Sequence, residues 1–418
     1  MSSIRPLIPL LIAAGILLGG NGLQATLIAL RGAQEGFAPT TIGWMGTSYF
    51  AGFLLGCVFV VRMMRSVGHI RCFAALAATA ACGTLLLVVV VDPIMWTAVR
   101  FVTGFCFAGL FTVMEAWLNS GSTNEDRARV LALYRIVDIS AVTGSQFLIP
   151  LLGTGGFTIF AVMAMLITFS MVPVSLGDRS NPQPPEEVKL DLKRAWAISP
   201  LAAIGCIAVG LTNSAFRTVG PVYAEQIGMS VSDVVIFVSL GIIGSVLVQY
   251  PLGALSDRWD RRKVLLLTTF MALLFALALA FLPGNDRWLN FVLVFFFGAF
   301  AMPLFSLSAA HANDRAGSGE FVLVSAALMF FYSVGAIAGP SIASYVMQAF
   351  GPPALFLFTS TIYTLFVLVI VFRMGVRPAV PGERRRRFRA MLRTSFMFAR
   401  LARPSGARRQ KASDRATG

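Results

Sequence analysis

The stretch Gly253-Ala254-Leu255-Ser256-Asp257-Arg258-Trp259-Asp260-Arg261-Arg262-Lys263 is a charged turn between two long apolar runs. The runs cover residues 231–255 and 264–281. At about 1.5 Å per residue in an α-helix, each is long enough to cross the ~30 Å hydrocarbon core of a bilayer. The turn must lie at a membrane surface, because ionic groups in hydrocarbon cost several kcal/mol. This stretch therefore predicts a hairpin of two membrane-spanning helices.

The composition places the rest of the chain in lipid as well. Of its 418 residues, 57% are hydrophobic and only 13% are charged, against about 25% charged in soluble domains. Backbone polar groups must be satisfied internally in hydrocarbon, and no alternating barrel pattern is present, so each apolar run should be a helix. Twelve such runs cover residues 6–30, 40–61, 72–91, 93–118, 130–152, 156–176, 198–222, 232–255, 264–283, 288–311, 321–348 and 353–372. The expected fold class is an all-α membrane protein with twelve transmembrane helices.

The positions of lysine and arginine predict the orientation. With the N-terminus inside, 29 of the 34 basic residues fall in cytoplasmic segments, and only Arg31 and Arg287 fall in outside loops. Short cytoplasmic loops carry an excess of positive charge. Both termini are therefore expected in the cytoplasm. The first apolar run is longer than the apolar region of a signal peptide and eleven spans follow it, so we interpret it as a retained helix.

The sequence carries few signals for other chemistry. The five cysteines lie in or at the ends of spans, which indicates neither a disulfide framework nor a metal site. No glycine-rich phosphate-binding loop of the kind that would indicate ATP hydrolysis is found. We expect no cofactor, no metal and no catalytic residue, so the chain is not expected to be an enzyme.

Most of the net charge of +15 belongs to the C-terminal tail. From Arg373 onward the chain has fourteen basic residues against Glu383 and Asp414, so the remaining body is close to neutral. Nucleic acid is therefore not an expected partner. Arg384 to Arg387 lead into apolar residues at helical spacing, which favours an in-plane helix on anionic lipid. A solvated tail is the alternative.

The two halves of the chain show a weak internal repeat. Residues 68–71 align with 260–263 at an offset of 192, and residues 104–119 align with 298–313 at an offset of 194. Two offsets that agree this closely indicate a six-helix unit repeated in parallel. The expected domains are an N-terminal bundle at 1–176, a cytoplasmic linker at 177–197, a C-terminal bundle at 198–374 and a basic tail at 375–418.

Over residues 1–375 the chain resembles the major facilitator superfamily of transporters. The loop signature of that family, Gly-x-Leu-x-Asp-Arg-x-Gly-Arg-Arg-x, is matched from Gly253 to Lys263, with Asp260 in place of the second glycine. The first half keeps only Gly68 and Arg71 of this signature. Arg100-x-x-x-Gly104 is similar to the second family motif, which implies proton coupling. The Glu115-Ala116-Trp117-Leu118-Asn119 run resembles a bacterial subgroup with unassigned substrates, which implies a bacterial inner-membrane protein.

The loop signature has the chemistry of a latch. Gly253 lets two helices approach closely, and Asp257 can pair with a basic residue. The guanidinium groups can hold lipid phosphates or the carbonyls at helix ends. Such contacts favour one state of a gate, whereas the alternative is a loop that is merely positive inside. The expected gate residues are Gly253, Asp257, Arg258, Arg261 and Arg262.

Five ionisable residues fall inside predicted spans, and each is costly unless it is paired or faces water. Counting along the spans places Arg100 and Arg217 in the outer half of the membrane, and Glu115, Arg135 and Asp138 toward the cytoplasm. Arg135 and Asp138 are three residues apart on one helix and can pair, and Glu115 can approach Arg135 from the preceding span. We expect these three residues either to carry protons or to form a structural gate network.

A solute site is expected in the centre of the bundle. In the family that the chain resembles, the first, fourth, seventh and tenth spans line the central cavity. This implies a polar group with two positive charges and no acid of its own, which suits an anionic or carboxylate-bearing solute. Alternatively, Arg217 extends to the outer interface and the amides join helices. The candidate binding residues are Asn21, Gln24, Arg100, Asn213 and Arg217.

Together these observations favour a monomeric secondary transporter that moves a small organic solute by alternating access. Protons are the expected coupling partner, and membrane lipids the expected surroundings. Two alternatives stay open at this stage. One is a drug or metabolite efflux antiporter, and the other is a membrane sensor that does not transport.

Overall fold

The structure is a computed structural model that describes residues 7–120, 127–176, 190–317 and 319–376. Within these residues every regular element is a helix, and twelve segments are long and apolar enough to span a membrane. The helices are α1 (Ile8–Gln34), α2 (Pro39–Val67), α3 (His69–Val89), α4 (Pro93–Ser120), α5 (Arg127–Gln146), α6 (Leu148–Leu152), α7 (Phe157–Phe169), α8 (Met171–Leu176), α9 (Leu192–Ile198), α10 (Pro200–Gln226), α11 (Val231–Arg258), α12 (Arg261–Phe281), α13 (Arg287–Ala301), α14 (Leu304–Arg315), α15 (Phe321–Phe350) and α16 (Ala354–Val376).

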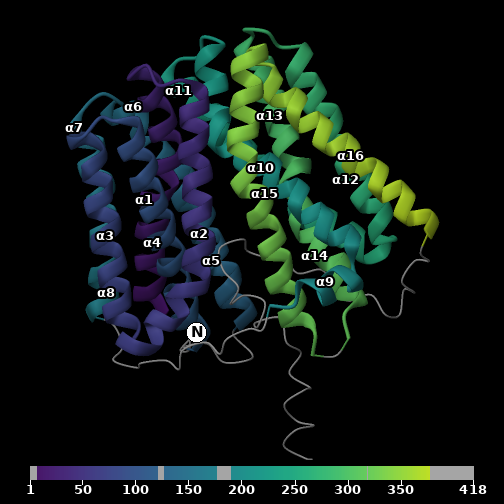
Figure 1. Cartoon of the computed structure of the whole chain (residues 1–418), viewed down its shortest axis with the longest axis horizontal. Coiled ribbons are helices and arrows are strands. Elements are labelled where there is room, and N and C mark those ends of the chain that lie inside the picture. Colours follow the sequence, from purple (N-terminus) through teal and green to yellow (C-terminus); the bar gives the residue numbers. More distant parts are fainter. Residues whose placement is uncertain (1–6, 121–126, 177–189, 318, 377–418) are drawn as a thin grey trace, which may run out of the picture.

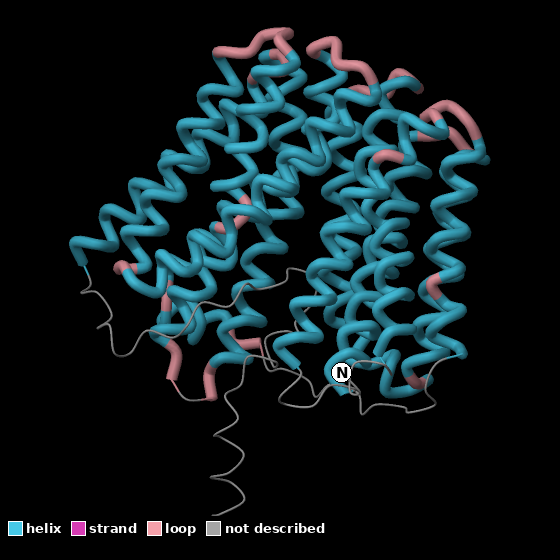
Figure 2. The backbone as a smooth tube through the Cα atoms, turned by 180° about the vertical axis from the view of Figure 1, so that it is seen from behind, coloured by secondary structure: helices cyan, strands magenta, loops and turns pink. Residues whose placement is uncertain are grey.

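Helices α1–α8 form one bundle and α10–α16 form the other, as Figures 1 and 2 show. We call the end with Ile8, Gly68 and Trp259 the N-terminal face, and the end with the turns at Gly36 and Gly228 the distal face. The two bundles meet at the distal face and diverge toward the N-terminal face. The expected fold of twelve membrane-spanning helices in two six-helix bundles is confirmed.

Three of the twelve expected spans are interrupted rather than continuous. The fifth span breaks between α5 and α6, the sixth between α7 and α8, and the tenth between α13 and α14. In the tenth span the break falls at Met302 and Pro303, where the proline has no N–H to continue the helical ladder. The predicted linker region also contains a short helix, α9. Its seven residues are too few for hydrophobic periodicity to reveal a helix.

Polar residues at the expected turns start several helices of the second bundle. Ser199 begins α10 by accepting from the Ala202 N–H, and Ser230 begins α11 by accepting from the Asp233 N–H. Such caps satisfy amides that lack an intrahelical partner. Asp260 does the same for α12, so this residue of the charged turn has a structural role at the helix start.

Glycines set the closest helix crossings, and they do so in the same way in both bundles. A Cβ on Gly104 of α4 would lie 2.1 Å from the Tyr49 carbonyl oxygen of α2. A Cβ on Gly298 of α13 would lie 2.0 Å from the Gly241 carbonyl oxygen of α11. Only a residue without a side chain permits backbones this close. The pairs α2/α4 and α11/α13 therefore occupy equivalent places in the two bundles.

We expect Gly104→Ala to destabilise the protein by about 1–3 kcal/mol, because α2 and α4 must separate to admit the methyl group. Gly144→Ala on α5 is the matched control, since its Cβ would meet nothing within 4 Å. The control should be neutral or slightly stabilising, as alanine favours helix more than glycine does. Thermal unfolding of the two purified variants measures the difference. Equal melting temperatures would contradict the close α2/α4 contact.

The bundles are joined at the distal face by α2 and α15. The Thr47 hydroxyl donates to the Ile337 carbonyl oxygen at 2.7 Å, and the Thr40 N–H donates to Gln348 Oε1 at 3.3 Å. Gly43 and Gly46 of α2 lie against Pro340 of α15. These contacts close the distal end between the two bundles.

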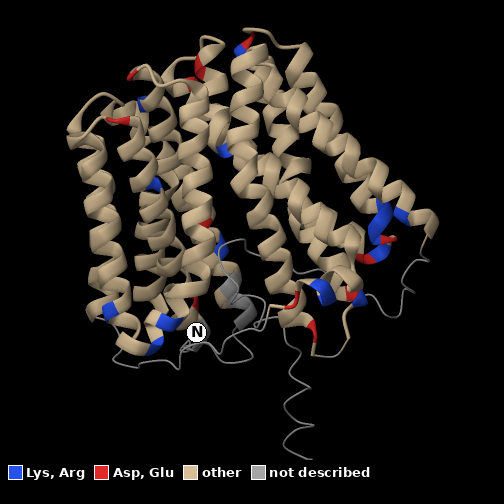
Figure 3. Ribbon diagram, viewed as in Figure 1, with Lys and Arg blue, Asp and Glu red and all other residues tan. Residues whose placement is uncertain are grey.

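The outer surface of the helices suits hydrocarbon. Figure 3 shows most charged residues near the two ends of the bundle and few along the middle. Large apolar side chains point outward from the spans, among them Leu176 at 81% exposure and Phe281 at 70%. In water such a belt would promote aggregation, whereas in a bilayer it contacts lipid chains.

Candidate functional site

A cavity of about 190 Å³ lies between the two bundles. Its wall comes from α1, α2, α4 and α5 on one side and from α10, α11, α14, α15 and the α13–α14 break on the other. Because both bundles contribute, relative movement of the bundles would reshape this space. The wall combines a charged group, a polar network and an aromatic surface.

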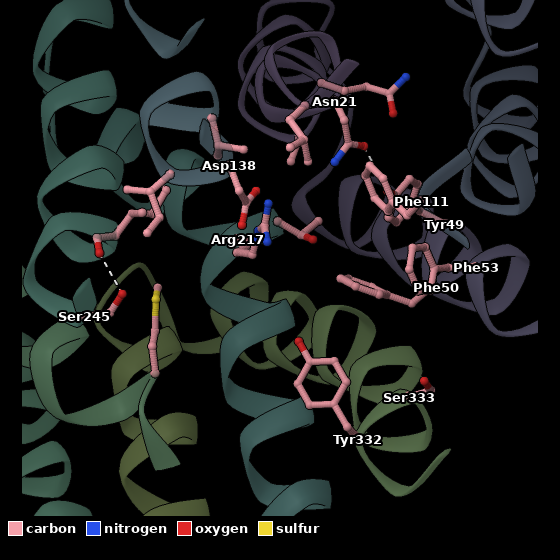
Figure 4. A pocket seen from close by; sticks show the side chains of 18 of the residues that line it. Asn21, Tyr49, Phe50, Phe53, Phe111, Asp138, Arg217, Ser245, Tyr332 and Ser333 are labelled. Carbon is pink, nitrogen blue, oxygen red and sulfur yellow. Dashed lines mark hydrogen bonds between the residues drawn. The ribbon is translucent and has the colours of Figure 1, made fainter. Parts of the chain in front are cut away.

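The charged group joins two helices from opposite bundles. On α5, Arg135 Nη1 donates to Asp138 Oδ2 at 3.1 Å. The two side chains are 34% and 13% exposed, so the pair borders the cavity. Arg217 of α10 points toward Asp138 across the cavity, and the two interact electrostatically (Figure 4). The pairing offsets the cost of embedding these ions in the membrane.

Arg100 is held inside the wall by a polar network. Its side chain is 4% exposed, and Nη1 donates to Gln24 Oε1 of α1. Its guanidinium lies 4.2 Å from the ring centroid of Tyr49, a cation–π contact. The Tyr49 hydroxyl in turn donates to Asn21 Oδ1 at 3.0 Å. This network holds Arg100 behind Tyr49. Arg100 still lines the cavity, so its positive charge contributes to the charge of the cavity wall.

The aromatic surface is formed by the same stretch of α2. Tyr49, Phe50 and Phe53 face the cavity together with Phe111 of α4 (Figure 4). The Phe53 and Phe111 ring centroids are 6.3 Å apart, within the range of favourable aromatic pairs. Tyr332 of α15 lines the opposite side. The cavity therefore offers an apolar surface beside charged groups, as small-molecule sites commonly do.

Two expected site residues do not line this cavity. Asn213 of α10 is buried, and it is not among the lining residues. Glu115 is also buried, and it too is absent from the residues that line the cavity. Asn21, Gln24, Arg100, Arg135, Asp138 and Arg217 do line it.

The cavity brings together charges that the sequence analysis assigned to two separate groups. The structure places Asp138 in the same cavity wall as Arg217 and Arg100, so the positive group has an acid beside it. Counting residues along one helix indicates depth, but it does not indicate which side chains of different helices line the same cavity. The interpretation of Arg217 as a residue extending to the outer interface also disagrees with its position on the cavity wall.

Sequence reasoning missed the contributions of the second, eighth and eleventh spans. Tyr49, Gln249 and Tyr332 line the cavity from these spans. The only available signal was the pair of aromatic residues at positions 49 and 53, one helical turn apart. In a membrane helix that pattern fits a lipid-facing stripe equally well, so it carries little information.

The expected gate residues have a buried centre at Arg261. Its side chain is 3% exposed and forms an ion pair with Asp314 of α14, which is 2% exposed. Arg261 Nη2 also contacts Asp257 Oδ1 at 3.2 Å, and Nη1 donates to Ser256 Oγ at 2.6 Å. Arg262 pairs with Asp260 at 2.8 Å. These contacts lie within the C-terminal bundle, and Asp314 is a partner that sequence reasoning did not identify.

The other gate residues are arranged around this centre. Gly253 is buried on α11, whereas Arg258, in the last turn of the same helix, is exposed. The linker helix α9 joins the bundle nearby, where Arg194 Nη2 lies 2.7 Å from Glu320 Oε1. The charged turn therefore joins α11, α12 and α14 by ion pairs at the N-terminal face of the C-terminal bundle.

Comparison with protein families places this arrangement among known transporters. The family model described as "Major Facilitator Superfamily" matches residues 10–320 and 202–405. An uncharacterized MFS-type transporter of Yersinia pestis (strain Pestoides F) is 28% identical over 375 residues, covering 87% of this chain and 94% of the relative. An uncharacterized MFS-type transporter of Enterobacter sp. (strain 638) is 26% identical over 384 residues, covering 90% and 97%.

Solved structures share the fold at low sequence identity. The nucleoside transporter NupG superposes with a TM-score of 0.74 at 14% identity, covering 88% of this chain and 98% of that chain. A bacterial homologue of the human lysosomal transporter Spinster, in an inward-facing and occupied conformation, superposes with a TM-score of 0.67 at 12% identity, covering 93% and 95%. At these identities the likeness concerns the fold alone.

Proposed function

The chain belongs to the major facilitator superfamily, and from that premise we propose that it moves a small anionic organic solute across the membrane by alternating access, coupled to protons. The cavity between the two bundles is the proposed solute site. Movement of the bundles about this site would expose it to either side in turn. The closed distal end and the diverging N-terminal face correspond to one such state.

The observation that carries the proposal is the charge of the cavity wall. Three arginines and one aspartate line it, which leaves an excess of positive charge in a space that is partly shielded from water. Arg100 is already engaged by Gln24 and Tyr49, whereas Arg217 is exposed to the cavity. Arg217 is therefore the proposed primary contact of a carboxylate, and its planar guanidinium suits two parallel hydrogen bonds.

We expect Arg217→Gln to weaken solute binding by about 1.5–3 kcal/mol, the typical contribution of a hydrogen bond to a charged group. Arg217→Lys should recover only part of the loss, because an ammonium group lacks the planar fork. Calorimetry is performed with the solute that ranks first in a thermal-shift screen of metabolites. Arg62→Gln removes an exposed charge of α2 outside the cavity and should leave affinity unchanged. A cationic solute, or equal affinity in the wild type and Arg217→Gln, would contradict the proposal.

Asp138 is the proposed proton carrier. Its carboxylate lies between Arg135 and Arg217 and borders the cavity, so protonation would alter the charge that the solute meets. Arg135 would then be the group that holds Asp138 in place. Glu115, which lies behind the wall, is the weaker candidate for this role.

The aromatic surface supports a second candidate function. Tyr49, Phe53 and Phe111 together suit a ring-bearing or amphipathic solute. A drug or metabolite efflux antiporter would need such a surface and could use the same acid. Flux in proteoliposomes with opposite pH gradients separates uptake from export, and the absence of flux with retained binding would indicate a sensor.

The proposed location is a bacterial inner membrane with the N-terminal face in the cytoplasm. The charged turn with Arg258 and Lys263 lies on that face, whereas Arg287 lies at the distal face. The proposed moving units are residues 1–176 and 198–374, joined by 177–197, in a monomer. The anionic-lipid helix expected after Arg384 falls outside the described residues.

A further inference from the structure

A second, smaller hollow lies at the N-terminal face, away from the transport cavity. It is lined by Arg262 of α12, His311 and Arg315 of α14, Arg373 of α16 and the α9–α10 junction at residues 198–201. We call this group of residues the basic cup. Its interior is about 10 Å³, roughly the space that one water-sized group needs. A single oxygen of a larger anion would fit inside, with the remainder at the mouth.

The charges around the basic cup favour an anion. Three guanidinium groups line it, and Asp260 is paired with one of them, Arg262, at 2.8 Å. The neighbouring Asp314 is engaged by Arg261. Arg373 forms no ion pair with any residue in the described part of the chain. The lining itself contains three guanidinium groups and no carboxylate.

Two neutral donors point to a ligand in the same place. His311 is 4% exposed and lines the cup, and its imidazole has no hydrogen bond to a residue within the described ranges. An imidazole nitrogen at the wall of a hollow can hydrogen-bond to a group that enters it. At the start of α10, Ser199 engages the Ala202 and Ala203 amides and Pro200 has none, which leaves the Leu201 N–H at the positive end of a long helix.

The position of the basic cup indicates where the anion comes from. Arg373 lies in the last turn of α16, beside Phe372 at 67% exposure and Val376 at 55%. These apolar side chains point outward from the final span, so the mouth of the cup is at the level of the lipid headgroups. A headgroup phosphate can reach this point without leaving the bilayer.

We propose that the basic cup is a phosphate-binding site occupied by the headgroup of an anionic membrane lipid. Arg315 and Arg373 would contact the phosphate oxygens, and His311 and the Leu201 N–H would complete its hydrogen bonds. The site joins α9, α10, α14 and α16, so a bound lipid would hold the end of the linker against the C-terminal bundle. This inference does not depend on which solute the central cavity accepts.

The test measures lipid binding to the full-length chain in detergent by native mass spectrometry. The probes are short-chain phosphatidylglycerol, short-chain phosphatidylcholine and inorganic phosphate. R373Q and R315Q should each weaken phosphatidylglycerol binding by roughly tenfold, as expected for losing a hydrogen bond to a charged group. K263Q removes an exposed charge next to Arg262 and should change binding by no more than about twofold, because exposed charges contribute little.

The outcomes separate the sources of the phosphate. Tighter binding of phosphatidylglycerol than of phosphatidylcholine, together with weaker phosphatidylglycerol binding in R373Q and R315Q but not in K263Q, supports the lipid headgroup. Inorganic phosphate that displaces the lipid, with the same dependence on the variants, supports the site but assigns it to a soluble phosphate. The proposal is overturned if phosphatidylglycerol binding weakens equally in all three variants or in none of them. R373Q alone is decisive should R315Q not fold, because Arg373 lies in the last turn of the last described helix, where a substitution disturbs few contacts.

Discussion

Replacing Asp138 with asparagine is expected to abolish pH-driven accumulation of the solute while leaving exchange intact. A gradient of one pH unit supplies about 1.4 kcal/mol per proton, which drives roughly tenfold accumulation when one proton accompanies the solute. The asparagine keeps the shape of the side chain and a hydrogen bond to Arg135 but cannot carry a proton. Exchange needs no net proton movement, so counterflow should continue. Proteoliposomes with an imposed pH gradient measure both activities.

Glu115→Gln is the comparison for this experiment. Asp138 is 13% exposed and lines the cavity, whereas Glu115 is 1% exposed and lies behind its wall. We therefore expect Glu115→Gln to retain pH-driven uptake, with any defect appearing as lower stability. Full pH-driven uptake in the Asp138→Asn variant would refute the proposed proton carrier. Loss of counterflow as well would indicate that Asp138 is structural.

Asp314→Asn should produce the largest loss of stability among the variants considered. Asp314 and Arg261 form an ion pair in which both side chains are at least 97% buried. Removing one partner of such a pair costs about 3–5 kcal/mol, because the other charge is left without its counter-ion in a low-dielectric region. Asp257 and Ser256 still contact Arg261, which favours the lower end of this range. Chemical denaturation of the purified protein measures the change.

Asp257→Asn is the matched control within the same network. Asp257 is 30% exposed, and its contact with Arg261 at 3.2 Å is partly screened by water. Its loss should cost about 1 kcal/mol or less. Transport is measured in the same pair of variants, since a latch role predicts altered flux for Asp257→Asn while the protein stays folded. Equal destabilisation by the two substitutions would contradict the assignment of Asp314 as the buried partner.

The membrane architecture could be predicted from particular stretches of sequence. The apolar runs on either side of the charged turn correspond to α11 and α12, within a few residues at each end. The weak repeat that aligned Gly104 with Gly298 is matched by equivalent helix crossings, because both glycines allow backbone contact at the same point of each bundle. The breaks at Phe147, Ser170 and Met302 were not predicted, since an apolar run gives no sign of a short interruption.

The candidate site was only partly predictable. Arg135 and Asp138 are three residues apart on one helix, and that spacing alone predicts the pair that the structure contains. The contacts between Arg100 and Tyr49, and between Arg261 and Asp314, join residues that are far apart in the sequence. No pattern of residues within one helix specifies a partner on another helix.

The sequence by itself determined that this chain spans a membrane twelve times, because hydrocarbon requires long apolar helices and leaves charges at their ends. It also determined which ionisable residues are embedded, since a charge inside an apolar run is evident from its neighbours. Only the tertiary structure decided which of them meet. Helix rotation, tilt and the reach of long side chains place Asp138 opposite Arg217 and keep Glu115 and Asn213 out of the cavity wall. Those quantities depend on packing between helices, which the order of residues along one helix does not specify.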